Sequence, residues 1–523
     1  MILRRVSQWL FGLLLFLLLA SHASADGGMF TWLPLPLPTA VSGLGWQIGL
    51  LSLLPVSISL LWLFSWIKQE HPQMTQMKKE SNYADSRSLS LSKAEAGGAN
   101  RFGFDRLSRR YAQNLREVLD KARSLEETSR RFNFGETAVT LPLAIFSLFI
   151  LTQISTDMFH YVAMLALVWF IYLFLVNNPQ WQQKQLWIIL ALVLLLQGGV
   201  GVAQFITQQE LGLTFLGEPT LDLLVEGTSV AQRGEQNWLR AYGLNSHPNQ
   251  LGLLLMALCL LIWPSRHLAH GWRSWLFWLG LAAGVAGLLV SLSRSAWLGL
   301  ALGGMVYGLH RAASGRLPRR ELALPLALLA AGVLLFTLAY GDVLAGRLLA
   351  LDSPLESRSL WERQRDGGLA LQLIEKRPFQ GVGLGKFVAS AAKIDASAAI
   401  VHNIPLLIGA ELGLLGLTLW LLFWGWPLWR YGRSPAHQSG TAVWLSLILV
   451  ALVQPEPTLF LPKGAVLWGL AAAQWQNHQP HQSEGVQINQ RFRRLKKLPL
   501  FLCSSLWLLS ESLCPKFPKR SQL

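Results

Sequence analysis

The sequence predicts an all-α fold, a polytopic transmembrane helical bundle of about twelve spans with a large outward loop between the ninth and tenth spans. Three observations predict it. Hydrophobic residues make up 52% of the 523 positions, only 14% are charged, and the chain contains 23 Trp. Soluble domains of this size rarely show that balance. Disorder, collagen and a coiled coil are thereby excluded, and long apolar runs exclude a soluble multidomain enzyme.

The spans are predicted from the apolar runs, because a helix needs about 20 apolar residues to cross about 30 Å of hydrocarbon. Twelve stretches come close, and the turns within 274–292/295–309 and 441–460/463–476 are very short. The stretches lie near 6–20, 42–67, 138–156, 159–176, 185–205, 248–264, 274–292, 295–309, 321–340, 404–427, 441–460 and 463–476.

The first run has two interpretations. Arg4 and Arg5 precede its apolar core, and Ala-Ser-Ala at 23–25 resembles a small-residue cleavage site. Cleavage and retention as a span both stay open, and in either case the next segment starts from the same side. Residues 1–67 are therefore interpreted as two N-terminal spans, the first possessing signal-like features.

Orientation follows from the short loops. If the N-terminus is cytoplasmic, the inside loops 177–184, 265–273, 310–320 and 428–439 contain Lys and Arg but no Asp or Glu. Positive charge in short loops marks the cytoplasmic side. The formal net charge of +16 then serves to orient the chain in the bilayer, and it gives no reason to expect a nucleic-acid partner.

Four regions follow from this topology. After residues 1–67 comes a polar, basic cytoplasmic insert at 68–135, with a predicted helix near 105–131. It would face solvent or lipid headgroups, or serve as a regulatory docking site. Residues 136–476 form the transmembrane core, with outward loops at 206–247 and 342–403. The basic cytoplasmic tail, 477–523, contains an apolar run at 498–510 that is too short to span and would lie on an anionic leaflet.

Arg240, Arg294 and His402 are far apart in sequence, yet each falls at the outward end of a predicted span. Arg240 precedes a helix that Pro248 would begin, with Ser246 or His247 in the cap region, so it is also compatible with an incidental cation at a helix start. Arg294 lies between two apolar runs, where an unpaired guanidinium costs at least about 2.5 kcal/mol toward the membrane centre. It needs an anionic partner or a function, unless it snorkels to water.

His402 could exchange a proton with a hydroxyl near neutral pH, although a lone interfacial histidine is often only a polar boundary residue. Glu411 lies about 13 Å further along the same predicted helix. We expect it to be a structural partner of another helix, with Arg294 as one candidate, and not to act together with His402.

The loop 342–403 contains Arg358 and a Gly-X-Gly-X-Gly run at 381–385 followed by Lys386. Such glycines could let backbone N–H groups approach an anion. Walker A, dinucleotide, HExxH and GxSxG motifs are absent from the sequence, and three scattered Cys give neither a disulfide framework nor a zinc site. ATP hydrolysis and zinc chemistry are therefore poorly supported, and no metal or cofactor is expected.

The order of four motifs resembles the O-antigen ligase and polymerase superfamily over about residues 200–427. The motifs are Arg-Ala-Tyr-Gly with His-Pro-Asn, Ser-Leu-Ser-Arg-Ser-Ala-Trp-Leu-Gly, Arg-Ser-Leu-Trp with Arg-Pro-Phe-Gln-Gly-Val-Gly-Leu-Gly-Lys-Phe, and His-Asn-Ile-Pro-Leu-Leu-Ile-Gly-Ala-Glu-Leu-Gly. The insert at 68–135 and the basic tail have no part in this pattern.

The resemblance implies a metal-independent glycosyltransferase of the bacterial inner membrane, with its active site facing the periplasm. It implies transfer of a glycan from an undecaprenyl-diphosphate carrier to an acceptor hydroxyl on lipid A core, another glycan or a protein. By motif position, Arg240 and Arg294 would hold the diphosphate and His402 would be the base. Arg358 is a further candidate; we add His247 and Lys386 as substrate-binding candidates. Arginines would stabilise the leaving diphosphate without a metal, and a base on the opposite side predicts inversion.

Other functions stay open. Within the superfamily the chain could be an O-antigen or exopolysaccharide polymerase, or a protein O-oligosaccharyltransferase. An anion transporter of the bicarbonate type would use Arg294 and Glu411 along its path. A membrane scaffold would bind a cytoplasmic partner through 68–135.

Overall fold

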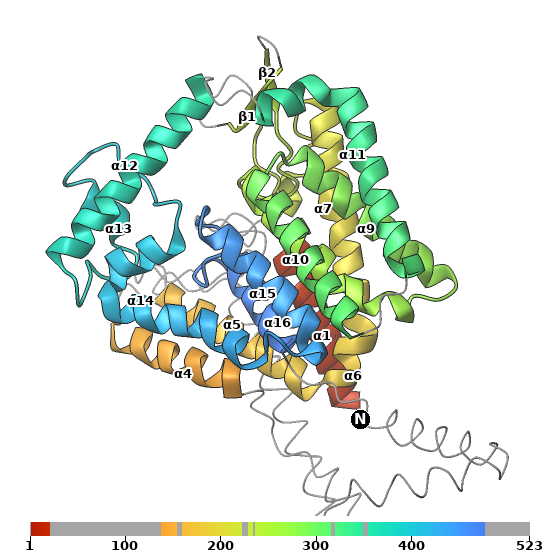
Figure 1. Cartoon of the computed structure of the whole chain (residues 1–523), viewed down its shortest axis with the longest axis horizontal. Coiled ribbons are helices and arrows are strands. Elements are labelled where there is room, and N and C mark those ends of the chain that lie inside the picture. The colour runs from red at the N-terminus through yellow and green to blue at the C-terminus, as the bar shows by residue number, and fades with distance from the viewer. Residues whose placement is uncertain are drawn as a thin grey trace, which may run out of the picture. The chain divides into compact units, whose positions relative to one another are not determined.

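The computed structural model describes residues 2–20, 137–153, 159–221, 228–233, 236–314, 319–348 and 354–475. The predicted span at 42–67, the insert at 68–135 and the tail at 477–523 lie outside these residues. Most described residues are helical (Figure 1). The helices are α1 (Ile2–Ala20), α4 (Thr137–Thr152), α5 (Phe159–Asn177), α6 (Pro179–Trp181), α7 (Trp187–Thr207), α8 (Pro248–Ile262), α9 (Trp272–Val290), α10 (Arg294–Ala313), α11 (Arg319–Leu348), α12 (Pro354–Lys376), α13 (Phe387–Ala391), α14 (Ile404–Tyr431), α15 (Gln438–Ala451) and α16 (Pro462–Ala473).

Short elements connect these helices. A π-helical turn, Gln182–Leu186, joins α6 to α7, and 3₁₀ turns cover Thr214–Leu216, Trp263–Leu268 and Pro435–His437. Strands β1 (Val230–Arg233) and β2 (Gln236–Leu239) pair antiparallel, with Val230 opposite Leu239. The hairpin is an addition to the predicted all-α fold.

Six helical segments among the described residues are long and apolar enough to cross a membrane. They are His160–Asn177, Pro179–Thr207, Pro248–Leu268, Trp272–Val290, Ala330–Arg347 and Ile404–Tyr431. Three shorter apolar helices, Arg5–Ala20, Ala138–Thr152 and Gln438–Ala451, accompany them. The architecture fits an all-α polytopic membrane protein, whereas the number of twelve spans stays a prediction.

Every predicted span that the structure describes coincides with a helix, but the range 441–460 is wrong at its end. Helix α15 ends at Ala451. Pro455 and Pro457 follow, and a proline disfavours the helical conformation of the residue before it. The segment between α15 and α16 is therefore a loop.

Small residues allow the helices to pack closely. Helix α7 packs along α9, where a Cβ at Gly287 would lie 2.6 Å from the Gly198 Cα atom. Helix α10 packs along α15, and the Ser446 hydroxyl donates to the Gly299 carbonyl at 2.7 Å. Close backbone approach through small residues is the usual way for membrane helices to associate.

Helix α14 is broken at Gly413, which has φ +69° and ψ −174°. The loop before α13 fills the break: the Leu414 N–H donates to the Pro378 carbonyl at 2.7 Å, and the Gly383 N–H donates to the Glu411 carbonyl at 2.9 Å. Broken helices are tolerated at membrane depth where other protein groups satisfy the backbone.

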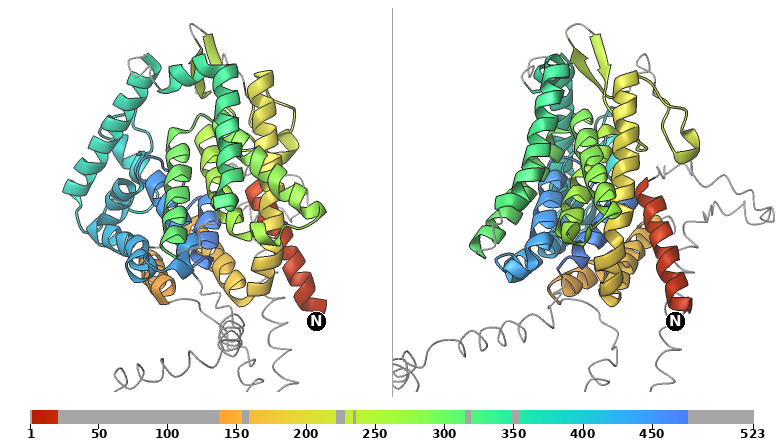
Figure 2. Two further views of the ribbon diagram at one scale, coloured as in Figure 1. Left: turned by 45° about the vertical axis from the view of Figure 1, so that its right-hand side comes forward. Right: turned by 90° about the vertical axis from the view of Figure 1, so that its right-hand side faces the viewer.

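The described parts of the four predicted inside loops lie at one end of the helices. The turn Trp263–Leu268 contacts Gln182–Leu186, and Arg266 donates to the Tyr307 hydroxyl of α10 at 3.5 Å. His310, also on α10, is 2.7 Å from the Gly432 carbonyl after α14. Figure 2 shows the β-hairpin at the opposite end from the N-terminus of α1.

Candidate functional site

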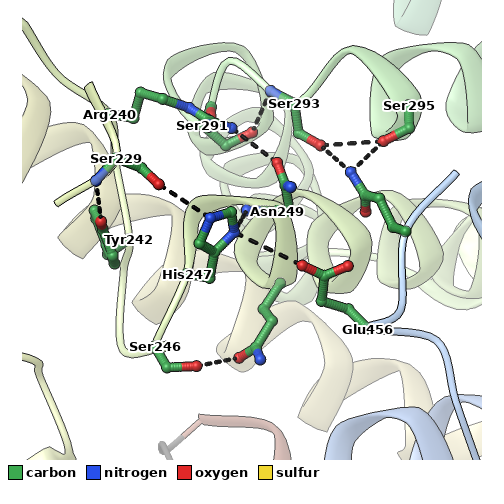
Figure 3. Close-up of polar contacts among 12 residues, drawn as sticks. Ser229, Arg240, Tyr242, Ser246, His247, Asn249, Ser291, Ser293, Ser295 and Glu456 are labelled. Atoms are coloured by element: carbon green, nitrogen blue, oxygen red, sulfur yellow. Dashed lines mark hydrogen bonds and ion pairs between the residues drawn. The ribbon is translucent and has the colours of Figure 1, made fainter. Parts of the chain in front are cut away.

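Arg240 follows the β-hairpin and is buried between the start of α8 and the end of α9 (Figure 3). Its Nε donates to the Ser291 carbonyl at 3.0 Å, and a terminal nitrogen donates to the Asn249 Oδ1 atom at 2.9 Å. The Ala241 N–H donates to the Val290 carbonyl at 3.1 Å. These bonds fix the guanidinium at the start of α8.

His247 caps α8. The Asn249 N–H donates to its Nδ1 at 3.1 Å, and its Nε2 lies 3.0 Å from the Ser229 hydroxyl. An Nδ1 that accepts a hydrogen bond belongs to a neutral imidazole whose proton is on Nε2. Burial, followed by the nearby charges of Arg240 and His402, lowers the pKa of His247 below its usual range, although the side chain keeps 37% of its surface exposed.

Glu456 reaches the same place from the loop between α15 and α16. Its Oε1 lies 3.7 Å from His247 Nδ1, and among the described residues its buried Oε2 has no hydrogen-bond partner. Burial raises its pKa to about 7, against the opposing charges of Arg363 and Arg240. The carboxyl group can therefore hold or release a proton near neutral pH.

Arg294 begins α10, next to the end of α11. Its guanidinium donates to the Arg347 carbonyl at 3.3 Å, and Arg347 Nε donates to the Leu292 carbonyl at 3.2 Å. Leu292 has φ +51°, in the left-handed region that bulky residues seldom adopt. Such strain is often found at functional sites.

A buried polar cluster supports this turn. The Gln454 amide donates to the Ser293 hydroxyl at 3.3 Å and also to the Ser295 hydroxyl. All three side chains are buried. Gln454 therefore ties the loop that contains Glu456 to the start of α10.

His402 precedes α14, whose cap is Asn403. Asn403 Oδ1 accepts the Leu406 N–H at 2.9 Å, and its amide donates to the Leu452 carbonyl at 2.9 Å. Burial lowers the pKa of His402, and so does the charge of Arg363, while Asp366 and Glu362 oppose the shift. Helix α12 therefore places charged side chains near the imidazole.

These residues form a single charged cluster, consisting of Arg240, His247, Arg347, Arg363, His402 and Glu456. His247 is near enough to Arg240, His402, Arg347 and Arg363 for each to affect its protonation. Arg363 and Arg240 are likewise near enough to Glu456 for their charges to lower its pKa. Arg294 adjoins the cluster through Arg347. Arg240 and His402, which are distant in sequence, therefore both lie near His247, and their joint role in one substrate site stays a prediction.

Two residues that the sequence predicted to bind substrate, Arg358 and Lys386, have exposed side chains. Arg358 is exposed on α12 and forms an ion pair with Glu362, one turn further on, at 3.0 Å. Lys386 is exposed at the start of α13. The substrate-binding role of both residues stays a prediction.

The glycine run binds an anion of the protein itself. The Phe387 N–H donates to the Glu411 carboxylate at 3.2 Å, and Gly385 contributes a second backbone hydrogen bond. Gly381, Gly383 and Gly385 all have positive φ, which glycine tolerates. The run therefore contacts a carboxylate of the protein itself, and the approach of a substrate anion to these N–H groups stays a prediction. Arg294 donates to the Arg347 carbonyl, and its pairing with Glu411 stays a prediction.

Three members of the cluster were missed from the sequence: Arg347, Arg363 and Glu456. Arg347 and Arg363 are ordinary in a loop that contains several other arginines. Glu456 was placed inside a span. The two prolines around it were the available signal, because they predict a break in the helix at that point.

Comparison with known proteins identifies one part of the chain. Residues 279–421 match the family model described as O-antigen ligase. The match runs from α9 into α14 and contains Arg294, Arg363 and His402, whereas Arg240, His247 and Glu456 lie outside it. No curated protein matches the chain. This matched segment supports the resemblance to the O-antigen ligase superfamily that the motif order indicates.

Proposed function

We propose that the protein is a glycosyltransferase of the bacterial inner membrane that moves a glycan from an undecaprenyl-diphosphate carrier to an acceptor hydroxyl on the periplasmic side. The observation that carries the proposal is the convergence of Arg240, Arg347 and Arg363 with His247 and His402, next to Arg294. A diphosphate is the kind of anion that several guanidinium groups bind well.

The chemistry can be written with these residues. The acceptor oxygen attacks the anomeric carbon while its proton passes to His402. The bond between the anomeric carbon and the phosphate oxygen breaks, and the diphosphate leaves with the electron pair. Arg240 and Arg294 stabilise the negative charge that develops on it. Attack opposite to the leaving group inverts the anomeric carbon.

His402 suits the role of base because its lowered pKa keeps the imidazole neutral at pH 7. His247 is neutral as well, but both of its ring nitrogens have partners: Asn249 at Nδ1 and Ser229 at Nε2. It therefore serves better as a support for Arg240 than as a base. The acceptor could be lipid A core, a glycan repeat or a protein hydroxyl.

Complementation of a knockout strain tests the proposal. We expect R240A, R294A and H402A each to lose at least about a hundredfold in transfer at normal membrane abundance, as removal of one group that stabilises charge commonly does. R273A is the matched control, since Arg273 lies at the other end of α9 and stacks on Trp272. Wild-type transfer in all three variants would refute the site.

Mass spectrometry of the surface glycans distinguishes the reactions. Loss of whole chains from the lipid indicates ligation, and retention of single repeats indicates failed polymerisation. Loss of glycan from proteins alone indicates an oligosaccharyltransferase. Uptake of bicarbonate by proteoliposomes that contain no polyprenyl donor would instead indicate a transporter.

A further inference from the structure

Asp366 on α12 is a buried carboxylate with one oxygen bound and one oxygen available. Its Oδ1 accepts from Arg365 at 2.7 and 2.9 Å, and the Ala399 N–H lies 3.3 Å from the same oxygen. Its Oδ2 is buried and has no hydrogen-bond partner among the described residues. A buried carboxylate oxygen without a donor is costly, so the site is suited to receive one.

His402 also has a buried polar atom that could form a hydrogen bond. Its Nδ1 is buried and likewise makes no hydrogen bond to any described residue. The Ala399 bond ties the loop before His402 to Asp366, and the Asp366 charge is near enough to raise the pKa of His402. Arg363 lies on the same face of α12, three residues before Asp366.

We propose that Asp366 is a positioning residue for His402, in the base role that the proposed function gives the imidazole. Its Oδ2 accepts the Nδ1–H when the acceptor fills the site, which leaves Nε2 to take the proton of the acceptor hydroxyl. The carboxylate stabilises the imidazolium that forms. Hydrogen bonds of catalytic groups commonly tighten only in the substrate complex, so their absence in the free protein is compatible with this role.

The arrangement sets opposing charges around one imidazole. Glu362, Arg363 and Asp366 affect His402 from α12, and His247 faces it from the start of α8. The Ile400 carbonyl is a competing acceptor close to the ring. Asp366 differs from Ile400 in carrying a charge, and an experiment on the titration of His402 can therefore separate the two.

The test is the pH dependence of His402 carbethoxylation by diethylpyrocarbonate, followed by peptide mass spectrometry on the full-length protein in detergent. It needs neither substrate nor activity. We expect D366N to lower the midpoint for His402 by about one pH unit, because a neighbouring negative charge is removed. R363Q should raise the midpoint. E375Q is the control, since Glu375 is exposed further along α12.

An unchanged midpoint in D366N would overturn the proposal and assign the orienting role to Ile400. If D366N fails to fold, D366E and R363Q keep the test decisive. D366E should restore the wild-type midpoint, and R363Q should shift it upward only if α12 sets the charge around His402. Without a shift in R363Q, and with D366E away from the wild-type midpoint, the proposal fails.

The transfer assay separates the two proposals. In D366N we expect the rate of transfer to fall about tenfold or more, with the rising limb of its pH profile moved to lower pH. If D366N shifts the titration of His402 but the H402A variant still transfers glycan, the pairing of Asp366 with His402 stands and the proposed function is refuted. If D366N leaves the titration unchanged and H402A is inactive, the proposed function stands and the pairing of Asp366 with His402 is refuted.

Discussion

Arg240 shows how one buried side chain can serve the fold and the substrate together. Its Nε and one terminal nitrogen are held by Ser291 and Asn249. These neutral acceptors fix the guanidinium without cancelling its charge. A carboxylate in place of Asn249 would neutralise that potential.

Asn249 therefore provides a test of preorganisation. We expect N249A to lower kcat/KM for glycan transfer about tenfold, because a hydrogen bond to a charged group is worth about 1.5 to 3 kcal/mol. Steady-state transfer by purified protein measures this. Q250A is the control, since the Gln250 side chain accepts a hydrogen bond from the exposed Ser246 hydroxyl at 3.0 Å. Equal kcat/KM in N249A and wild type would show that Arg240 needs no anchor.

Glu456 predicts a pH dependence of stability. Its pKa is raised from the usual 4.5 to about 7 in the folded protein, so the folded state binds more protons than the unfolded state between these values. Stability from this group is complete below pH 4.5 and is lost as the pH rises toward 7. The apparent Tm in detergent should fall more between pH 5 and 7.5 in wild type than in E456Q. Parallel curves would contradict the shift.

At the residue scale the sequence predicted the arginines at the ends of spans and His402, because polar groups next to apolar runs are conspicuous. It could not distinguish Arg358 from Arg363, which are five residues apart on the same helix. Only the packing of α12 decides which of them faces the histidines. Glu456 was hidden by an apolar run that continues past the real end of α15.

At the scale of elements, the break in α14 depends on Gly413. Its φ of +69° with ψ of −174° is accessible to glycine almost alone, and a Cβ there would collide with the Phe379 carbonyl. We expect G413A to lower stability by about 1 to 3 kcal/mol. It should also increase proteolysis in the loop 378–387, which docks in the break.

Gly425 is the matched control on the same helix. A Cβ at Gly425 would meet nothing within 4 Å, and its backbone is helical. G425A should leave the apparent Tm unchanged or raise it slightly, because alanine favours a helix over glycine. Equal Tm values for G413A and G425A would contradict the account of the break.

The elements between spans were the hardest to predict. Helix α12 begins at Pro354, inside the predicted outward loop 342–403. Charged residues in its first turns conceal its apolar face. The hairpin at 230–239 was not predicted, since its strands have four residues each and an exposed start to β2.

At the scale of the whole molecule, hydropathy predicted the helices well, because each apolar run must bury its backbone within a helix in lipid. The order of short basic loops also predicted which helix ends lie together. The predicted spans, however, could not show that α15 and α16 are joined by a loop that enters the site.

Orientation can be measured on two exposed positions. Gln183 lies in the turn before α7 and Ala396 lies in the loop before His402. We expect a membrane-impermeant maleimide to label A396C in intact spheroplasts and to label Q183C only after permeabilisation. Labelling of both positions from the same side would contradict a bundle with its site at the end opposite the basic loops.

The most direct test of the central claim is binding of undecaprenyl diphosphate to purified wild type, R240A, R294A and H402A, measured beside transfer on the same preparations. If Arg240 and Arg294 bind the diphosphate leaving group and His402 takes the proton, R240A and R294A lose donor binding and transfer together. H402A keeps donor binding and loses transfer. Undiminished binding in both arginine variants, or wild-type transfer by H402A, would contradict the account.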